Sequence, residues 1–378
     1  MLKEVITIKK ILFGITSLTL GGAERVLVDI SNKLSEKYDI TIFSIYDNGE
    51  LKNDLNKNVK FKALYNCRYD ELTKLQKMWI PIKILLFSKI IYNKKIKQNY
   101  DTEIAFLEGP ITRLFSTKNK DVHKIAWIHN DIEKVFGNDL KSKIKKYIDK
   151  NIYKKYNDLV FVSQDNMEKF QNIYNDLNTE NMHVIYNYID KDLVIKKSNY
   201  NIKVEFDYNS INFLTVCRLV KQKAIDRFIR VHSKLIKRGL KHKVYIIGDG
   251  PEKENLQKLI KQENVEDTFV LLGKKENPYP YIKNANYFCL LSEFEGYGMV
   301  LEEAKILNKP IIITNTAARE CIENYPKALI LENSEDEIYD GLYKLLNDND
   351  DKIFNNTQTN TEYDNTEKLQ KIIELVGD

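Results

Sequence analysis

The feature that most constrains the fold of this chain is a repeated alternation of short β-branched runs with longer helical patterns. Such alternation is typical of βαβ units, which build parallel sheets covered by helices. Seven runs in the first half predict strands at 11–16, 40–45, 59–64, 103–107, 124–129, 159–163 and 183–187. Six more predict strands at 211–217, 243–248, 268–273, 287–291, 310–314 and 328–332. The pattern therefore predicts an α/β fold with two sheets.

The length of 378 residues favours two domains, since one core of ordinary size rarely holds so many. We expect domains at 1–190 and 211–360, joined by a polar linker at 191–210 that shows no helical period, and a terminal helix at 361–378. Ligands of doubly wound sheets bind beyond the carboxyl ends of the strands. Residues that directly follow a strand are therefore the candidates for a site.

Composition indicates a soluble cytoplasmic enzyme. The chain is 43% hydrophobic and 30% charged, and a net charge of +5 does not demand nucleic acid. Its four cysteines are scattered without a CxxC pair or a histidine at metal-ligand spacing, which predicts reduced thiols and no metal centre. No run reaches the ~20 apolar residues that span a bilayer. The nearest approach, 80–92, is interrupted by Lys83 and Lys89.

The segment SEFEGYGMVLEEAKILNKPIIIT (292–314) predicts a helix that begins near Gly298, between two strands. The first amides of that helix, at Met299, Val300 and Leu301, carry the positive end of the helix dipole and suit a phosphate.

Four carboxylates surround this turn and would repel a phosphate, so they need another use. Spacing and the flanking glycines favour Glu295 and Glu303 as acceptors of hydrogen bonds from ligand hydroxyls. For Glu293 and Glu302 we prefer the plainer interpretation, in which acidic residues near a helix start complement its dipole.

Two further strand ends carry candidate residues. In CRLVKQK (217–223), Arg218 and Lys223 could bind a diphosphate and stabilise the charge that it gains on leaving, without a metal, although a solvated surface cation is the commoner fate of either side chain. In IGDGPEKE (247–254), Gly248 and Gly250 fit close approach to a ligand and a simple turn equally well.

The first half offers Gly21 and Gly22 before a helix, where a ligand could lie against the backbone, and His129 at the end of a strand. A lone histidine is usually structural, but this position favours polar contact with a reacting group.

Together these elements resemble glycosyltransferase family 4, retaining enzymes of the GT-B architecture, in which two Rossmann-like doubly wound domains face a central cleft. Members of this kind build bacterial surface glycans. The resemblance rests on six elements that follow the family's order along nearly the whole chain: GGAERV (21–26), WIHND (127–131), CRLVKQK (217–223), IGDGPEKENL (247–256), LLGKKENPYPYIKNA (271–285) and EGYGMVLEEA (295–304).

The resemblance implies a nucleotide-diphosphate sugar, by default a UDP-sugar, bound mainly by the second domain, and a glycan or polyprenyl-linked acceptor bound mainly by the first. It implies no cofactor, no metal and no assigned nucleophile. The implied donor contacts are Arg218 and Lys223 to the diphosphate, Glu303 to ribose, Glu295 to the sugar, the backbone of 298–301 to phosphate, and Gly273 with Lys274 beside the base. His129 would touch the donor sugar near its reacting carbon, and Gly22 would line the opposite side of the cleft.

This sequence departs from the family pattern at two places. Ala224 stands where a glycine is usual, a change from which we expect little effect, and the alanines of NTAARECI (315–322) leave the role of Glu320 open. The triplet Asp348-Asn349-Asp350 matches the metal-binding pattern of the other major glycosyltransferase architecture, but its place in a polar tail favours a solvated loop.

Several alternatives stay open. A basic helix with seven lysines at 140–156 could lie on an anionic membrane or be an ordinary surface helix. The chain could be an inactive nucleotide-sugar-binding subunit, or a GT-B sugar epimerase. Nucleic-acid binding is a distant third function.

Overall fold

The computed structural model describes residues 8–96, 100–117, 119, 121–129, 140–347, 354 and 363–377, and it divides the chain into two compact units. The first domain comprises 1–189 together with 365–378, and the second comprises 190–364.

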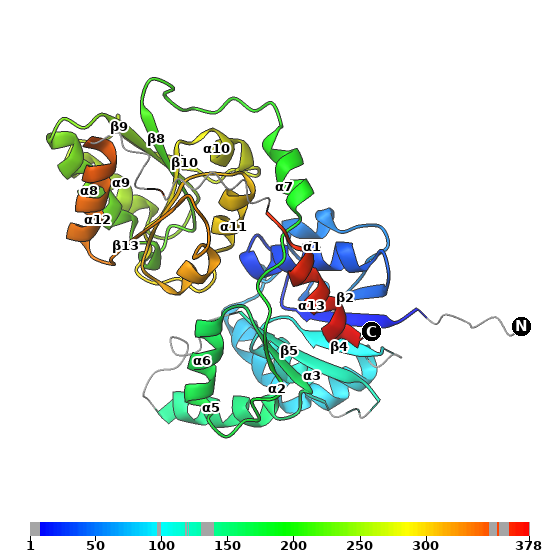
Figure 1. Ribbon diagram of the computed structural model, residues 1–378. Coiled ribbons are helices and arrows are strands. Elements are labelled where there is room, and N and C mark those ends of the chain that lie inside the picture. Colours follow the sequence, from blue (N-terminus) through cyan, green and yellow to red (C-terminus); the bar gives the residue numbers. More distant parts are fainter. Residues whose placement is uncertain are drawn as a thin grey trace, which may run out of the picture. The chain divides into compact units, whose positions relative to one another are not determined.

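The first domain is built on a seven-stranded parallel sheet in the order β3-β2-β1-β4-β5-β6-β7 (Figure 1). The strands are β1 (Lys10–Ile15), β2 (Asp39–Tyr46), β3 (Lys60–Tyr65), β4 (Thr102–Ala105), β5 (His123–Ile128), β6 (Asp158–Phe161) and β7 (Met182–Val184). The helices are α1 (Gly22–Leu34), α2 (Lys74–Lys95), α3 (Pro110–Phe115), α5 (Leu140–Tyr153), α6 (Gln164–Ile173) and α13 (Thr366–Gly377), with a 3-10 turn at Glu50–Asp54.

The second domain has a six-stranded parallel sheet in the order β10-β9-β8-β11-β12-β13. Its strands are β8 (Ile211–Val216), β9 (His242–Ile247), β10 (Phe269–Gly273), β11 (Tyr287–Leu290), β12 (Ile311–Thr314) and β13 (Ala328–Leu331). Its helices are α7 (Lys191–Ser198), α8 (Ile225–Lys237), α9 (Lys253–Glu263), α10 (Tyr279–Asn284), α11 (Met299–Ile306) and α12 (Glu335–Asn347), with 3-10 turns at Lys221–Lys223 and Ala317–Cys321. Figure 1 shows α8, α9 and α12 on one face of the sheet and α10 and α11 on the other.

Every predicted run forms a strand, and most boundaries agree within two residues. The largest difference is at 183–187, where β7 ends at Val184. Both sheets are doubly wound, because their strand orders reverse direction at β1/β4 and at β8/β11.

The linker expected at 191–210 is wrong in its first part, because 191–198 forms helix α7. The Asp190 side chain accepts a hydrogen bond from the Leu193 amide at 2.9 Å and caps the helix, and Lys196 and Lys197 lie in its last turn. These are ordinary helix-end signals. The polar composition of the segment hid them.

The terminal helix α13 belongs to the first domain, not to a separate element after the second. Its Ile372 and Val376 are fully buried, and the Thr102 hydroxyl donates to the Val376 carbonyl at 3.1 Å. The chain therefore crosses between the domains twice.

The basic helix expected at 140–156 is present as α5, but its apolar positions do not share one environment. Ile152 and Tyr156 are buried in the core of the first domain, whereas Ile144 is 53% exposed. No helix among the described residues has the length and apolar content to cross a bilayer.

Candidate active site

The candidate site of the second domain lies where its strand order reverses, between β8 and β11. The chain leaves β8 toward Arg218 and Lys223, and it leaves β11 toward Glu295 and Gly298. Because the carboxyl ends of neighbouring parallel strands lie at one edge of a sheet, the two connections meet there.

An ion pair joins the two connections. The Lys223 ammonium contacts the Glu295 carboxylate, and these side chains are only 15% and 13% exposed. The Ser292 hydroxyl donates to the same carboxylate at 3.3 Å. The structure thus brings together two residues for which the sequence predicted separate ligand contacts.

Gln222 holds the same connections together through its backbone and its side chain. Its carbonyl accepts from the Glu293 amide at 2.9 Å, and its amide nitrogen Nε2 donates to the Phe294 carbonyl at 2.9 Å. Arg218, by contrast, is exposed at the end of β8. The Lys223 and Glu295 positions are therefore fixed by the fold, and the Arg218 guanidinium is open to solvent.

Ala224 occupies a backbone conformation that L-residues avoid. It has φ 47° and ψ 38°, in the left-handed region, and is only 1% exposed where it begins α8. Glycine adopts this conformation without a Cβ clash. The position explains in physical terms why a glycine would suit it.

Gly298 begins α11 with φ 62° and ψ 68°, which confirms the predicted helix start. The Leu301 amide donates to the Gly298 carbonyl at 2.8 Å, so that amide is already used within the first turn. Phosphate contact by Met299, Val300 and Leu301 stays a prediction.

Glu303 and Glu302 have different partners. The Tyr279 hydroxyl donates to Glu303 at 3.1 Å, and Glu303 is 9% exposed. Glu302 is 1% exposed, accepts from the Tyr297 hydroxyl and lies 3.3 Å from the Lys305 ammonium. Glu302 therefore does more than complement a dipole, because its tyrosine and lysine partners fix it inside the domain.

The glycines at 248 and 250 allow two loops to pack closely. A Cβ on Gly248 would lie 1.8 Å from the Cys217 carbonyl oxygen, and one on Gly250 would lie 2.3 Å from the Leu219 carbonyl oxygen. Packing against the loop that carries Arg218 thus accounts for both glycines. Ligand contact by Gly248 stays a prediction.

Gly273 ends β10 with φ 70°, and no atom lies within 4 Å of the position of a Cβ. Its carbonyl accepts from the Gly248 amide at 3.0 Å, and the exposed Lys274 follows it. The space beside this backbone is compatible with the predicted position of the nucleobase of the donor.

Cys217 is not poised as a nucleophile, although it directly precedes Arg218. Burial raises the pKa of its thiol to about 12, and the nearby Lys223 cation opposes this only in part. The thiol therefore stays protonated at neutral pH.

In the first domain, Gly22 follows β1, Glu108 follows β4 and His129 follows β5, so all three lie at the carboxyl edge of that sheet. The His129 amide donates to the Glu108 carboxylate at 2.7 Å. Burial lowers the pKa of the His129 imidazole to about 3, so the ring is neutral. Its buried Nε2 has no hydrogen-bond partner within the part of the chain that the structure describes. Gly22 is exposed at the start of α1.

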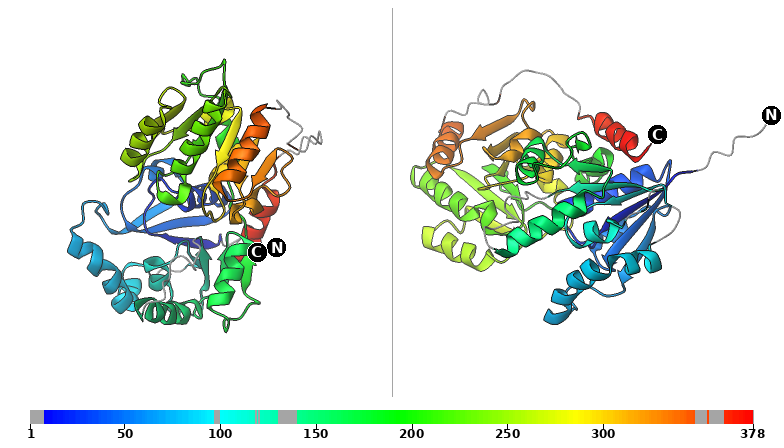
Figure 2. Two further views of the ribbon diagram at one scale, coloured as in Figure 1. Left: turned by 90° about the vertical axis from the view of Figure 1, so that its left-hand side faces the viewer. Right: turned by 90° about the horizontal axis from the view of Figure 1, so that it is seen from below.

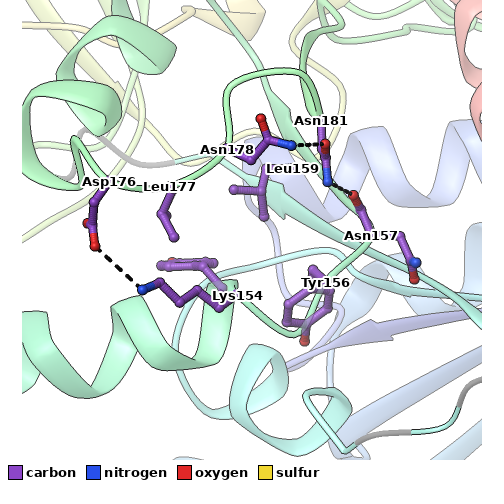
Figure 3. A pocket seen from close by; sticks show the side chains of 9 residues that line it. Lys154, Tyr156, Asn157, Leu159, Asp176, Leu177, Asn178 and Asn181 are labelled. Atoms are coloured by element: carbon purple, nitrogen blue, oxygen red, sulfur yellow. Dashed lines mark hydrogen bonds and ion pairs between the residues drawn. The ribbon is translucent and has the colours of Figure 1, made fainter.

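The first domain has a cavity of about 160 Å³ (Figure 3). Its lining includes none of the candidate residues of the second domain and none of Gly22, Glu108 and His129. It is lined by residues that precede β6 and β7 or lie near their starts, among them Lys154, Asn157, Asp176 and Asn181. The Asn181 amide donates to the Asn157 carbonyl at 2.7 Å, and Lys154 lies 3.4 Å from Asp176. This cavity is therefore at the amino edge of the sheet, opposite the edge that carries His129.

Sequence reasoning missed Ser292, Tyr279 and Glu108. Tyr279 lies in the quoted element 271–285, but nothing in its spacing relates it to Glu303. Glu108 does follow a predicted strand directly, and that signal could have found it. Asp348-Asn349-Asp350 lies outside the described residues, and among those that are described no cluster of histidine, cysteine or carboxylate side chains could hold a metal.

Residues 196–363, which carry the whole candidate donor site, match the family of glycosyl transferases group 1. This match lies in the second domain and supports a glycosyltransferase activity for the chain. A relative from Campylobacter jejuni is the N-acetylgalactosamine-N,N'-diacetylbacillosaminyl-diphospho-undecaprenol 4-alpha-N-acetylgalactosaminyltransferase, 28% identical over 88% of this chain and 89% of its own. The poly(ribitol-phosphate) alpha-N-acetylglucosaminyltransferase of Staphylococcus aureus is 24% identical over 68% of this chain and 51% of its own.

The fold of this glycosyltransferase is also shared with solved structures. Anabaena Alr3699/HepE in complex with UDP and glucose superimposes with a TM-score of 0.74, at 17% identity, over 97% of this chain and 98% of that one. Staphylococcus aureus TarM gives a TM-score of 0.74 at 16% identity, over 99% of both chains. The two Rossmann-like domains are those of the GT-B architecture, as predicted.

Proposed function

We propose that this glycosyltransferase moves a hexose or a related sugar, with retention of configuration, from a nucleotide-diphosphate donor to a glycan or lipid-linked acceptor. A UDP-sugar is the proposed donor, and surface polysaccharide assembly on the cytoplasmic side of the membrane is the proposed setting. The reaction needs no cofactor and no metal ion in this proposal.

The observation that carries the donor assignment is the Lys223–Glu295 pair at the strand-order reversal of the family-matched domain. Lys223 and the exposed Arg218 supply positive charge for a diphosphate, and Glu303 and Glu295 supply acceptors for hydroxyls. Hydrogen bonds to charged groups contribute ~1.5 to 3 kcal/mol each, so removing one carboxylate should weaken donor binding about tenfold to a hundredfold.

The names of the relatives support the acceptor class. The Campylobacter enzyme is named for an undecaprenol-linked acceptor, and the Staphylococcus enzyme for poly(ribitol phosphate). Both acceptors are long anionic or lipid-linked molecules, and we extend that class to this chain.

In the proposed reaction the bond between the sugar carbon and the diphosphate oxygen breaks, the acceptor hydroxyl attacks from the same face, and the hydroxyl proton passes to the leaving diphosphate. Arg218 and Lys223 stabilise the negative charge that develops on the diphosphate. His129, neutral because burial lowers its pKa to about 3, can contact the donor sugar through Nε2 without adding charge. We assign no covalent nucleophile.

A thermal-shift screen of nucleotide sugars, followed by transfer assays with the best donor, tests this proposal. We expect a stabilising donor whose effect is lost in Glu303→Ala and Lys223→Ala, an α-linked product from an α-linked donor, and activity that survives a metal chelator. Unchanged shifts in both variants would overturn the site assignment. Donor binding without transfer to any acceptor would indicate the inactive subunit, and sugar conversion without acceptor would indicate an epimerase.

A further inference from the structure

Helix α2 of the first domain is apolar on two opposite sides. Ile80, Ile84 and Tyr92 point into the core and are at most 9% exposed. On the other side, Leu75, Trp79, Ile82 and Leu86 follow one another at i, i+4, i+7 and i+11 and are 66%, 57%, 38% and 67% exposed. A helix of a water-soluble domain normally presents polar residues on its outer side, so this one is built to meet a second apolar environment.

Three further residues enlarge the exposed apolar surface. Met78 and Ile90 are 54% and 53% exposed, and Phe87 is 49% exposed at a kink in the helix, where its φ is −117° and its ψ is 18°. Figure 2 shows α2, in light blue, along the outer edge of the first domain. We call the exposed apolar residues of this helix the α2 patch: Leu75, Met78, Trp79, Ile82, Leu86, Phe87 and Ile90.

The charge around the α2 patch distinguishes between two possible binding partners, a second copy of the chain and a lipid bilayer. The helix carries six lysines, at 74, 77, 83, 89, 94 and 95, and no acidic residue. No ion pair joins Lys83 or Lys89 to a carboxylate among the described residues. A second copy of the chain seated on the same patch would bring like charges together. A surface with negative charge at its rim and hydrocarbon beneath it is complementary, and an anionic lipid bilayer is such a surface.

We propose that α2 lies in the interface of an anionic membrane, with the α2 patch between the headgroups and the acyl chains and its lysines among the phosphates. The exposed Trp79 suits this depth, since tryptophan favours the boundary between headgroups and hydrocarbon. This surface is a better candidate than the basic helix α5, whose Ile152 and Tyr156 are occupied by the core. The proposal does not rest on the transfer reaction, because no sugar or nucleotide takes part in it.

Intrinsic fluorescence of the full chain tests the depth of α2 directly. The chain has two tryptophans, of which Trp127 is 1% exposed and Trp79 is 57% exposed, so a change on vesicle binding reports Trp79. With vesicles of equal parts phosphatidylglycerol and phosphatidylcholine, we expect a blue shift of emission and quenching by lipids brominated on the acyl chain. Pure phosphatidylcholine vesicles should give a much weaker response.

Vesicle flotation of variants tests the surface. Trp79→Ser combined with Leu86→Ser should lower the fraction bound about tenfold or more, and Lys83→Gln combined with Lys89→Gln should remove the preference for anionic lipid. The matched control is Tyr200→Ser combined with Tyr208→Ser, which removes aromatic residues that are 50% and 69% exposed in the second domain and should leave binding unchanged.

Two results would overturn the proposal. One is a wild-type chain that neither floats nor shifts its emission with anionic vesicles while it binds a nucleotide sugar, which would also separate this failure from a failure of the proposed function. The other is a change of sedimentation from dimer to monomer in Trp79→Ser/Leu86→Ser without any vesicle binding by the wild type, which would assign the patch to a second copy.

Discussion

At the scale of single residues, the Lys223–Glu295 contact sets the charge of the proposed donor site. Each group neutralises the other, so a bound diphosphate must share Lys223 with a carboxylate. Strand-end position predicted both residues as site residues. It could not predict their pairing, because that depends on two connections separated by 72 residues in sequence.

Glu295→Gln and Lys223→Gln should therefore change the binding of a free nucleoside diphosphate in opposite directions. We expect Glu295→Gln to tighten UDP binding, because it removes a negative charge and releases Lys223, while sugar transfer falls. Lys223→Gln should weaken UDP binding about tenfold or more. Calorimetric titration of UDP measures both. Weaker UDP binding in Glu295→Gln would show that the carboxylate positions the lysine instead of competing for it.

Ala224→Gly tests the backbone conformation at the start of α8. An alanine in the left-handed region costs ~1 kcal/mol or more relative to glycine, partly offset by the greater flexibility of glycine in the unfolded chain. We expect Ala224→Gly to raise the free energy of unfolding by up to ~1 kcal/mol, measured by urea denaturation. Asn264→Gly, at φ 57°, is the matched comparison, and it should gain less because asparagine tolerates this region better.

At the scale of elements, the alternation of strands and helices was enough to predict every strand, because hydrophobic period and β-branching are local properties. Two features were not predicted. Helix α7 lies in a polar segment without helical period, although Asp190 caps it. The packing of α13 on the first domain depends on contacts with Thr102, which lies 274 residues before Val376. The role of Gly248 could not be predicted either, because the sequence around a turn glycine is the same whether a ligand or another loop lies against its backbone.

The packing of α8 on β9 contains a buried histidine pair that should make stability depend on pH. His232 Nδ1 and His242 Nε2 are 2.8 Å apart, His242 Nδ1 faces the Leu240 carbonyl at 2.9 Å, and His232 Nε2 faces the Thr268 hydroxyl at 2.9 Å. This chain of bonds is satisfied when both rings are neutral, with His242 donating to Leu240, His232 donating to His242 and Thr268 donating to His232. Burial lowers the pKa of His232 to about 2 and that of His242 to about 4.

Because the unfolded rings take up protons near pH ~6.5 and the folded rings do not, the unfolded state binds more protons below that pH. The stabilisation is present above pH ~6.5 and is lost as the pH falls, by ~2 kcal/mol per histidine between pH ~7.5 and ~5. Urea denaturation at the two pH values measures the loss, and His232→Leu/His242→Leu should reduce it. If the imidazole proton resonances of His232 and His242 titrate near pH ~6.5 in the folded chain, this interpretation is contradicted.

At the scale of the whole molecule, the chain returns to its first domain through α13. A substitution that disrupts the packing of that helix should therefore lower the stability of the first domain and leave the second domain unchanged. Ile372→Ala removes a fully buried side chain and should destabilise the first domain by ~2 to 5 kcal/mol. Both tryptophans lie in the first domain, so their fluorescence follows its unfolding, and UDP binding reports the second. We expect the fluorescence transition to move and UDP affinity to stay unchanged. Lys371→Ala, on the exposed side of the same helix, is the control.

Calorimetric titration of UDP into the wild type, Arg218→Ala, Glu303→Ala and Lys237→Ala tests most directly whether the strand-order reversal of the second domain holds the donor. Lys237 is an exposed lysine of that domain that pairs with Glu263 away from β11, so its loss should not matter. We expect wild-type affinity in Lys237→Ala and losses of about tenfold to a hundredfold in Arg218→Ala and Glu303→Ala. Equal affinity in all four proteins, or no binding of any nucleoside diphosphate, would contradict the assignment.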